Sequence, residues 1–163
     1  MRLFVAIELS EDMKKSAVSM LHTMKQNGVK GNYTPIQNLH VTLCFIGEAQ
    51  DKRPIADALS TVTYKPFKLS FTEIGNFGDL LWVGTRGGQG INTLAADIRK
   101  AFDNAGITYD AKKFVPHITL VRNAVGQTGK ITVPDTNMMV KRVSLMKSER
   151  VNGKMVYTEV FGI

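Results

Sequence analysis

One short pattern occurs twice in the sequence and restricts how the chain can fold. Residues 40–43 (HVTL) and 117–120 (HITL) each read histidine, β-branched aliphatic residue, threonine and leucine. The two copies are separated by nearly half of the 163-residue chain, and they use two of its three histidines. These two tetrads indicate an internal duplication in which each half of the chain supplies one histidine.

Both tetrads have the pattern of a β-strand with one polar and one apolar face. Side chains alternate between the faces of a strand, so His40 shares a face with Thr42. His117 shares a face with Thr119 in the same way. The aliphatic residues point to the other face, into a core. If the two halves pack around an approximate two-fold axis, two histidines and two threonines face one cleft.

These four polar side chains suit chemistry at phosphorus. One imidazole can take a proton from an attacking oxygen while the other protonates the leaving oxygen, because a reference pKa of about 6.5 permits both roles near neutral pH. Threonine hydroxyls can donate hydrogen bonds to the non-bridging phosphate oxygens, where negative charge develops. A single such tetrad is more often an ordinary strand with a hydrogen-bonded histidine. The second copy is what favours a catalytic site.

Residues that flank the tetrads suggest further contacts. Arg122 follows the second tetrad and can hold a phosphate by two parallel hydrogen bonds, although strict alternation puts it on the face opposite His117. The only cysteine, Cys44, lies two residues beyond Thr42, so alternation places it at the edge of the cleft, where we interpret it as filler and not as a nucleophile. A zinc site needs further ligands that no Cys or His cluster supplies, so no metal or cofactor is expected.

Hydrophobic periodicity outside the tetrads predicts alternating strands and helices. Strands are predicted at 3–7, 39–46, 67–74, 80–83, 114–121, 140–146 and 154–160. Helices are predicted at 11–27, 54–62 and 91–105, the first capped by Ser10. Turns and connections are predicted at Gly47, which should end the first tetrad strand, and at 30–35, 75–78, 87–90 and 123–130. Asn152-Gly153 predicts a hairpin turn between the last two strands.

The chain has the size and composition of one compact α+β domain. With 44% hydrophobic and 21% charged residues it resembles an ordinary globular protein, and no linker separates independent units. We expect a single domain, 1–163, with pseudo-symmetric lobes at approximately 1–85 and 86–163 that can exchange strands. Glu8 interrupts the first apolar run before a signal-peptide core forms, and no run approaches the roughly 20 residues of a membrane span. A cytoplasmic, non-membrane protein is therefore expected.

The charge balance favours anionic partners. Lys and Arg number 21 against 14 acidic residues, which gives a formal net charge of +7. Such a surplus attracts polyanions and accelerates their encounter with the protein. Solubility alone could also account for it, so charge leaves nucleic-acid binding and simple solubility open.

The tetrads and their flanks resemble the 2H phosphoesterase superfamily, and in particular its LigT-like branch, the RNA 2′,3′-cyclic phosphodiesterases once called 2′-5′ RNA ligases. The resemblance covers nearly the whole chain, including residues 2–7, 38–48 and 114–122. It implies a bilobal α+β fold of duplicated βαβ-type units, with mostly antiparallel sheets around a central cleft. It also implies metal-independent hydrolysis of a 2′,3′-cyclic phosphate on RNA ends or nucleotides to a 2′-phosphate. We expect the protein to be a monomer.

The resemblance also implies roles for single residues. His40 would be the proton donor to the departing 3′ oxygen, and His117 would be the proton acceptor that activates water. Thr42 and Thr119 would hold the phosphate, and Arg122 would assist them. The residues themselves do not say which histidine is the acid.

Two positions and two other activities stay open. Cys44 occupies a position where the branch often has Lys or Arg, which lowers the positive charge there. Tyr33 stands where an aromatic residue is often found and could stack on a base or pack in the core. A non-catalytic RNA- or nucleotide-binding module of the same fold is one alternative to hydrolysis. A 2′-5′ RNA ligase is the other, because two histidines can run the reaction in either direction.

Overall fold

Two antiparallel sheets form the frame of the molecule. The computed structural model describes all residues, 1–163. Its strands are β1 (Arg2–Glu8), β2 (Lys30–Tyr33), β3 (His40–Glu48), β4 (Phe67–Phe77), β5 (Leu80–Arg86), β6 (His117–Val125), β7 (Asn137–Val140), β8 (Ser144–Val151) and β9 (Lys154–Gly162). One sheet, in the order β3-β1-β8-β9, is called the His40 sheet, and the other, β2-β6-β5-β4-β7, the His117 sheet. The predicted α+β class with antiparallel sheets is confirmed.

Each sheet combines strands from both halves of the chain. In the His40 sheet, β1 pairs with β3 on one side and with β8 on the other. In the His117 sheet, β2 pairs with β6 and β4 pairs with β7. Neither sheet is therefore complete without residues from beyond position 116.

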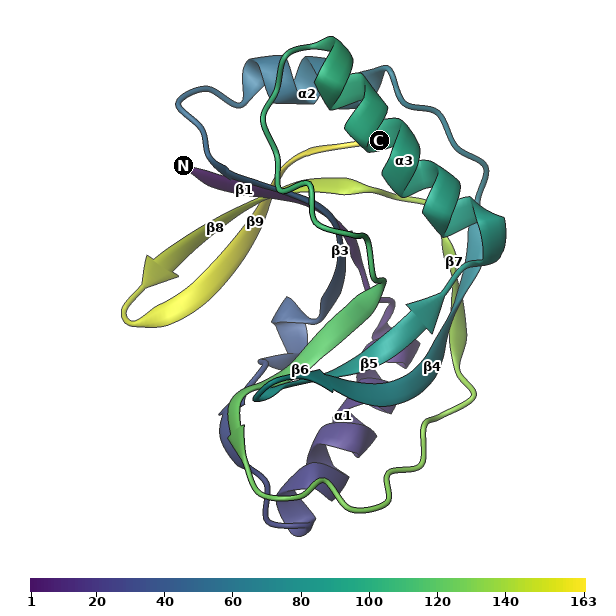
Figure 1. The fold of residues 1–163 in the computed structure, drawn as a ribbon, viewed down its shortest axis with the longest axis vertical. Coiled ribbons are helices and arrows are strands. Elements are labelled where there is room, and N and C mark those ends of the chain that lie inside the picture. The colour runs from purple at the N-terminus through teal and green to yellow at the C-terminus, as the bar shows by residue number, and fades with distance from the viewer.

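Three α-helices cover the outer faces of the sheets: α1 (Glu11–Gln26), α2 (Arg53–Ser60) and α3 (Gly88–Asn104). Figure 1 shows α2 and α3 together at one end of the molecule and α1 at the other. The cap predicted for α1 is present, because Ser10 Oγ accepts a hydrogen bond from the Met13 backbone N–H at 3.3 Å. No helix of this chain has both the length and the hydropathy that crossing a bilayer requires.

The two edge strands of the His117 sheet are missing from the prediction. The segment predicted as a connection at 30–35 contains β2, which pairs with β6. The single strand predicted at 140–146 is wrong, because β7 and β8 lie in different sheets. β2 is polar and mostly exposed, so it lacks the apolar alternation by which a strand is recognised in a sequence.

Four predicted boundaries are also wrong. β3 continues through Gly47, which adopts a left-handed φ of 92° inside the strand. β4 extends to Phe77, so the turn predicted at 75–78 begins only at Gly78. α3 starts at Gly88, inside the predicted connection at 87–90, and β6 runs on to Val125, into the predicted connection at 123–130. Glycine is common in turns, but it also occurs inside strands where the backbone is irregular or where another group packs closely against it.

The hairpin of β8 and β9 extends beyond the body of its sheet. β1 pairs with β8 only as far as Ser148, whereas β8 and β9 continue to pair up to Val151 and Lys154. Residues 149–156 therefore form a two-stranded arm, which reaches away from the rest of the molecule in Figure 1. Its turn is the predicted one: Asn152 and Gly153 both have positive φ, 52° and 76°.

Candidate active site

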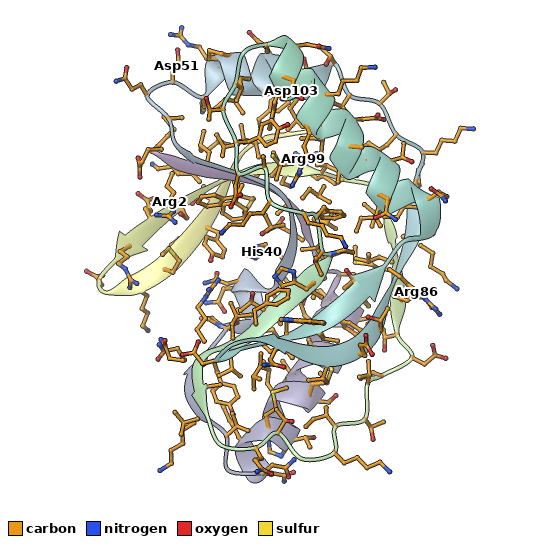
Figure 2. The ribbon with its side chains drawn as sticks, viewed as in Figure 1. Arg2, His40, Asp51, Arg86, Arg99 and Asp103 are labelled. Carbon is orange, nitrogen blue, oxygen red and sulfur yellow. The ribbon has the colours of Figure 1, made fainter.

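The two tetrads lie on neighbouring strands of different sheets. His40 begins β3 and His117 begins β6, and these two strands contact each other across the middle of the molecule. Figure 2 places His40 in this central region, between the two sheets. Arg122 and His117 both lie within electrostatic reach of His40, because positive charge at either position lowers the pKa of His40. The aliphatic residues of the tetrads are fully buried in the core, as alternation predicts.

His40 is held by one backbone hydrogen bond and two aromatic rings. Its Nδ1 lies 2.7 Å from the carbonyl oxygen of Asn38, and its Nε2 lies 3.0 Å from Thr42 Oγ1. The rings of Phe4 and Tyr157 lie 5.0 and 5.2 Å from the imidazole, centroid to centroid. Tyr157 meets the imidazole edge-on, at 88°. These contacts fix the ring on the wall formed by the His40 sheet.

His117 has the same kind of support on the opposite wall. Its Nδ1 lies 2.6 Å from the carbonyl oxygen of Val115, two residues earlier, as in the first tetrad. The rings of Phe77 and Trp82 lie 5.2 and 6.1 Å from the imidazole. The two halves thus repeat both the tetrad and the way in which its histidine is held.

The backbone hydrogen bonds decide which nitrogen of each histidine is available for chemistry. A carbonyl oxygen can only accept a hydrogen bond, so the Nδ1 of His40 and that of His117 must each carry a proton. The nitrogen left for proton exchange in each ring is therefore Nε2. His117 Nε2 has no hydrogen bond in the protein, and His40 Nε2 contacts only the Thr42 hydroxyl, at 3.0 Å. Paired acid–base chemistry can use this arrangement.

A β-bulge follows the first threonine and corrects the prediction for Cys44. Val5 of β1 pairs with Cys44 and Ala6 pairs with Thr42, so Leu43 is an extra residue in β3. The extra residue reverses the alternation of the residues after it. Cys44 consequently points into the core, where it is only 2% exposed, and does not edge the cleft. Burial raises the pKa of the Cys44 thiol to about 12, which leaves it inert as a nucleophile.

The second tetrad has a bulge at the equivalent position. Leu81 of β5 pairs with Val121 and Trp82 pairs with Thr119, so Leu120 is the extra residue in β6. Val121 therefore joins the core, and Arg122 returns to the face that carries His117. This explains how Arg122 acts on His40 although strict alternation assigns it to the opposite face.

The structure does not bring Tyr33 to the histidines. Tyr33 pairs with the buried Val121 across β2 and β6, and paired side chains lie on one face of a sheet. Its hydroxyl donates a hydrogen bond to the Val29 carbonyl at 2.7 Å, and the ammonium of Lys25 lies 4.7 Å from its ring. Of the two uses considered for Tyr33, these contacts support packing beside α1. The third histidine, His22, is exposed on α1.

Burial lowers the pKa of His40 below its ordinary value of 6.5. The neighbouring positive charges of Arg122 and His117 lower it further, while the hydrogen bond to the Asn38 carbonyl acts in the opposite direction. A positive neighbour disfavours a second positive charge, so Arg122 makes His40 harder to protonate than it would be without this arginine. Near neutral pH, His40 in the free protein is therefore mostly uncharged.

Removing the charge of Arg122 is expected to raise the pKa of His40. With only three histidines in the chain, the imidazole protons can be assigned by single substitutions and titrated by NMR. Arg122→Gln should move the His40 titration to higher pH. Arg2→Gln is the matched control. Arg2 lies on the His40 sheet, over the Phe45 ring, but its charge does not affect the pKa of His40. An unchanged His40 titration in Arg122→Gln would show that Arg122 points away from the cleft.

The aromatic supports of the histidines were not found from the sequence. Phe4, Tyr157, Phe77 and Trp82 lie on four different strands, and none has a fixed spacing from a tetrad. Only the pairing of strands brings them to the imidazoles. No group of three or more His, Cys, Asp or Glu side chains lies close enough together to hold a metal ion.

Known proteins share both the sequence pattern and the fold. A model of the 2′-5′ RNA ligase superfamily matches residues 14–152. An RNA 2′,3′-cyclic phosphodiesterase of Archaeoglobus fulgidus is 32% identical over 130 residues, which cover 75% of this chain and 72% of the relative. The protein of the same name from Escherichia coli is 26% identical over 166 residues, which cover 96% of this chain and 92% of the relative.

The solved structures agree with the sequence matches. LigT of E. coli, crystallised with 3′-AMP, superposes with a TM-score of 0.84 at 24% identity, covering 99% of this chain and 96% of that one. This chain belongs to the 2′-5′ RNA ligase superfamily. The predicted resemblance and the LigT-like fold are confirmed, and the names of the relatives agree with the expectation of a phosphodiesterase.

Proposed function

We propose that this protein hydrolyses the 2′,3′-cyclic phosphate of RNA ends or nucleotides to a 2′-phosphate, with His40 and His117 as the acid–base pair and without a metal. The observation that carries the proposal is the matched presentation of the two imidazoles. Each has Nδ1 fixed by a carbonyl two residues earlier, leaves Nε2 available, and rests on two aromatic rings. The names of the relatives support the same reaction.

In the proposed reaction, a water oxygen attacks phosphorus from the side opposite the 3′ oxygen. His117 Nε2 accepts a proton from this water as the new P–O bond forms. His40 Nε2 donates its proton to the 3′ oxygen as the P–O3′ bond breaks. The product carries a 2′-phosphate beside a free 3′ hydroxyl. His117 is then protonated and His40 neutral, and proton exchange with solvent restores both.

Three further side chains are assigned to the phosphate. The hydroxyls of Thr42 and Thr119 would donate hydrogen bonds to the non-bridging oxygens, and the Arg122 guanidinium would offset their charge. The position of Thr42 supports this assignment, since its Oγ1 already lies 3.0 Å from His40 Nε2. A phosphate oxygen bound by Thr42 would therefore be next to the nitrogen that donates the proton.

The lowered pKa of His40 requires the substrate to help charge it. A phosphate anion beside an imidazole favours the protonated form and raises its pKa. Binding of the cyclic phosphate therefore counteracts the effects of burial, Arg122 and His117 on His40. In this scheme the proton needed by the departing 3′ oxygen is taken up when the substrate binds.

The reaction is tested by the chemistry of its product. Purified protein is expected to convert a nucleoside 2′,3′-cyclic phosphate entirely to the 2′-phosphate in the presence of EDTA, as followed by ³¹P NMR. A 3′-phosphate product, or loss of activity with EDTA, would contradict the proposal. Tight RNA binding without turnover would instead favour the binding-module alternative. Joining of RNA fragments in the same assay would favour the ligase.

A further inference from the structure

The arm of β8 and β9 is fixed against His40 at its base. Tyr157 of β9 supplies one of the two rings that support the imidazole. Asn38, whose carbonyl binds His40 Nδ1, also donates a hydrogen bond from Nδ2 to the Met155 carbonyl of the arm at 3.0 Å. Asn38 is only 6% exposed. This one residue therefore ties the arm and the histidine together.

One face of the arm continues the wall on which His40 lies. Ser148 pairs with Tyr157, and Arg150 pairs with Met155, so these four side chains share the face of the Tyr157 ring. Successive residues of one face are about 6–7 Å apart along a strand. Arg150 therefore lies one step along the arm from the residue that contacts His40.

Arg150 is an exposed cation without an acidic partner. Its only hydrogen bond runs from Nη1 to the Gly153 carbonyl, at 3.3 Å, and no carboxylate lies within salt-bridge distance. The other face of the arm is different, because Lys147 there forms an ion pair with Glu149, 3.5 Å apart. Arg150 thus places a positive charge without a carboxylate partner on the face that adjoins the cleft.

The proposed reaction places the ribose on the same side. Attack opposite the 3′ oxygen puts the attacking water near His117, so the 3′ oxygen and its ribose lie near His40. The nucleotide that precedes the cyclic end is attached through the 5′ oxygen of this ribose. The arm extends from the His40 sheet and not from the His117 sheet. The preceding nucleotide would therefore lie next to the arm.

From these contacts we infer that the arm binds the RNA strand immediately 5′ to the cyclic end, with Arg150 contacting the first phosphodiester of that strand. The inference rests on the proposed function and on His40 as the acid. It makes an RNA chain of two or more nucleotides the preferred substrate over a cyclic mononucleotide. Backbone contacts of this kind fix position without reading base sequence.

The arm offers a matched pair of substitutions for the test. Arg150→Gln and Lys154→Gln each remove one positive charge from the exposed end of the arm. Lys154 pairs with Val151, on the opposite face, so it cannot contact the same strand. General electrostatic attraction falls equally in both variants, whereas a direct contact is lost only in Arg150→Gln.

The measured quantity is kcat/KM for a trinucleotide with a 2′,3′-cyclic end and for the cyclic mononucleotide of the same terminal base. Arg150→Gln is expected to lower the value at least about fivefold for the trinucleotide, the scale of a partly exposed charged contact. The mononucleotide value should stay within about twofold of wild type, since it has no second phosphate for an arginine to bind. Lys154→Gln should change neither value appreciably.

Binding of a 3′-phosphorylated trinucleotide provides a readout that does not need turnover. The slope of log Kd against log salt should fall by about 0.7 in Arg150→Gln, the value for one contact to a single strand. Equal losses on both substrates, equal losses in both variants, or no loss for the trinucleotide would each overturn the inference. If wild-type protein hydrolyses neither substrate, the proposed function fails, and the binding slopes still decide whether the arm holds RNA.

Discussion

Replacing either His40 or His117 with alanine is expected to reduce kcat/KM for a cyclic phosphate at least about a hundred-fold. General acid or base catalysis by one group contributes about a hundred- to ten-thousand-fold. Because the two imidazoles act in one displacement step, the double variant should lose little more than the worse single variant. The measurement is steady-state hydrolysis of a nucleoside 2′,3′-cyclic phosphate by the two single variants and the double variant.

Two controls separate catalysis from folding in this experiment. His40→Gln and His117→Gln keep most of the volume between the aromatic rings and should be as inactive as the alanine variants. His22→Ala, on the exposed face of α1, should retain full activity. Wild-type rates in either His40→Ala or His117→Ala would end the assignment of that residue. Fully additive losses would indicate that the histidines act in separate steps.

Gly75→Ala is expected to lower kcat about a hundred-fold without unfolding the protein. A methyl group at this position would overlap the outer ring of Trp82, which crosses Gly75 on the neighbouring strand. The Trp82 ring must then move, and because it is one of the two rings that support His117, the imidazole loses its position. A displacement of about 1 Å in a catalytic group can cost on the order of a hundred-fold in rate.

The single tryptophan makes this displacement directly observable. Trp82 is the only tryptophan of the chain, so intrinsic fluorescence reports its surroundings alone. The emission of Gly75→Ala should differ from that of wild type. A second change, Trp82→Phe, removes the atoms that overlap and should restore part of the lost kcat. Wild-type emission together with wild-type kcat in Gly75→Ala would contradict the supporting role of Trp82.

The sequence predicted those strands and helices in which polar and apolar residues recur at regular spacing. Alternation placed His40 and Thr42 on one face, and the helix predicted at 11–27 and its Ser10 cap were also correct. The bulges at Leu43 and Leu120 could not be predicted this way, because one extra residue reverses the alternation without a mark in the sequence. The position of Cys44 was therefore wrong.

Other features depend on partners that are distant in the chain. β2 and β7 are strands because β6 and β4 pair with them, and their own residues lack a strong strand pattern. The rings around each imidazole come together for the same reason. Gly75 looked like part of a turn, whereas its role is to admit the ring of Trp82. Such contacts exist only once the tertiary structure does.

The interleaving of the strands has a consequence for how this protein is made. Arg2 pairs with Ser148 and Phe67 pairs with Val140, so both sheets are completed by residues near the end of the chain. Pairings of such long range close large loops and slow folding. At about 5–20 residues per second, a ribosome holds the growing chain for many seconds before β8 emerges. Both tetrads thus leave the ribosome before the cleft between them can form, because the sheets that carry them are completed only once β7 and β8 have been synthesised.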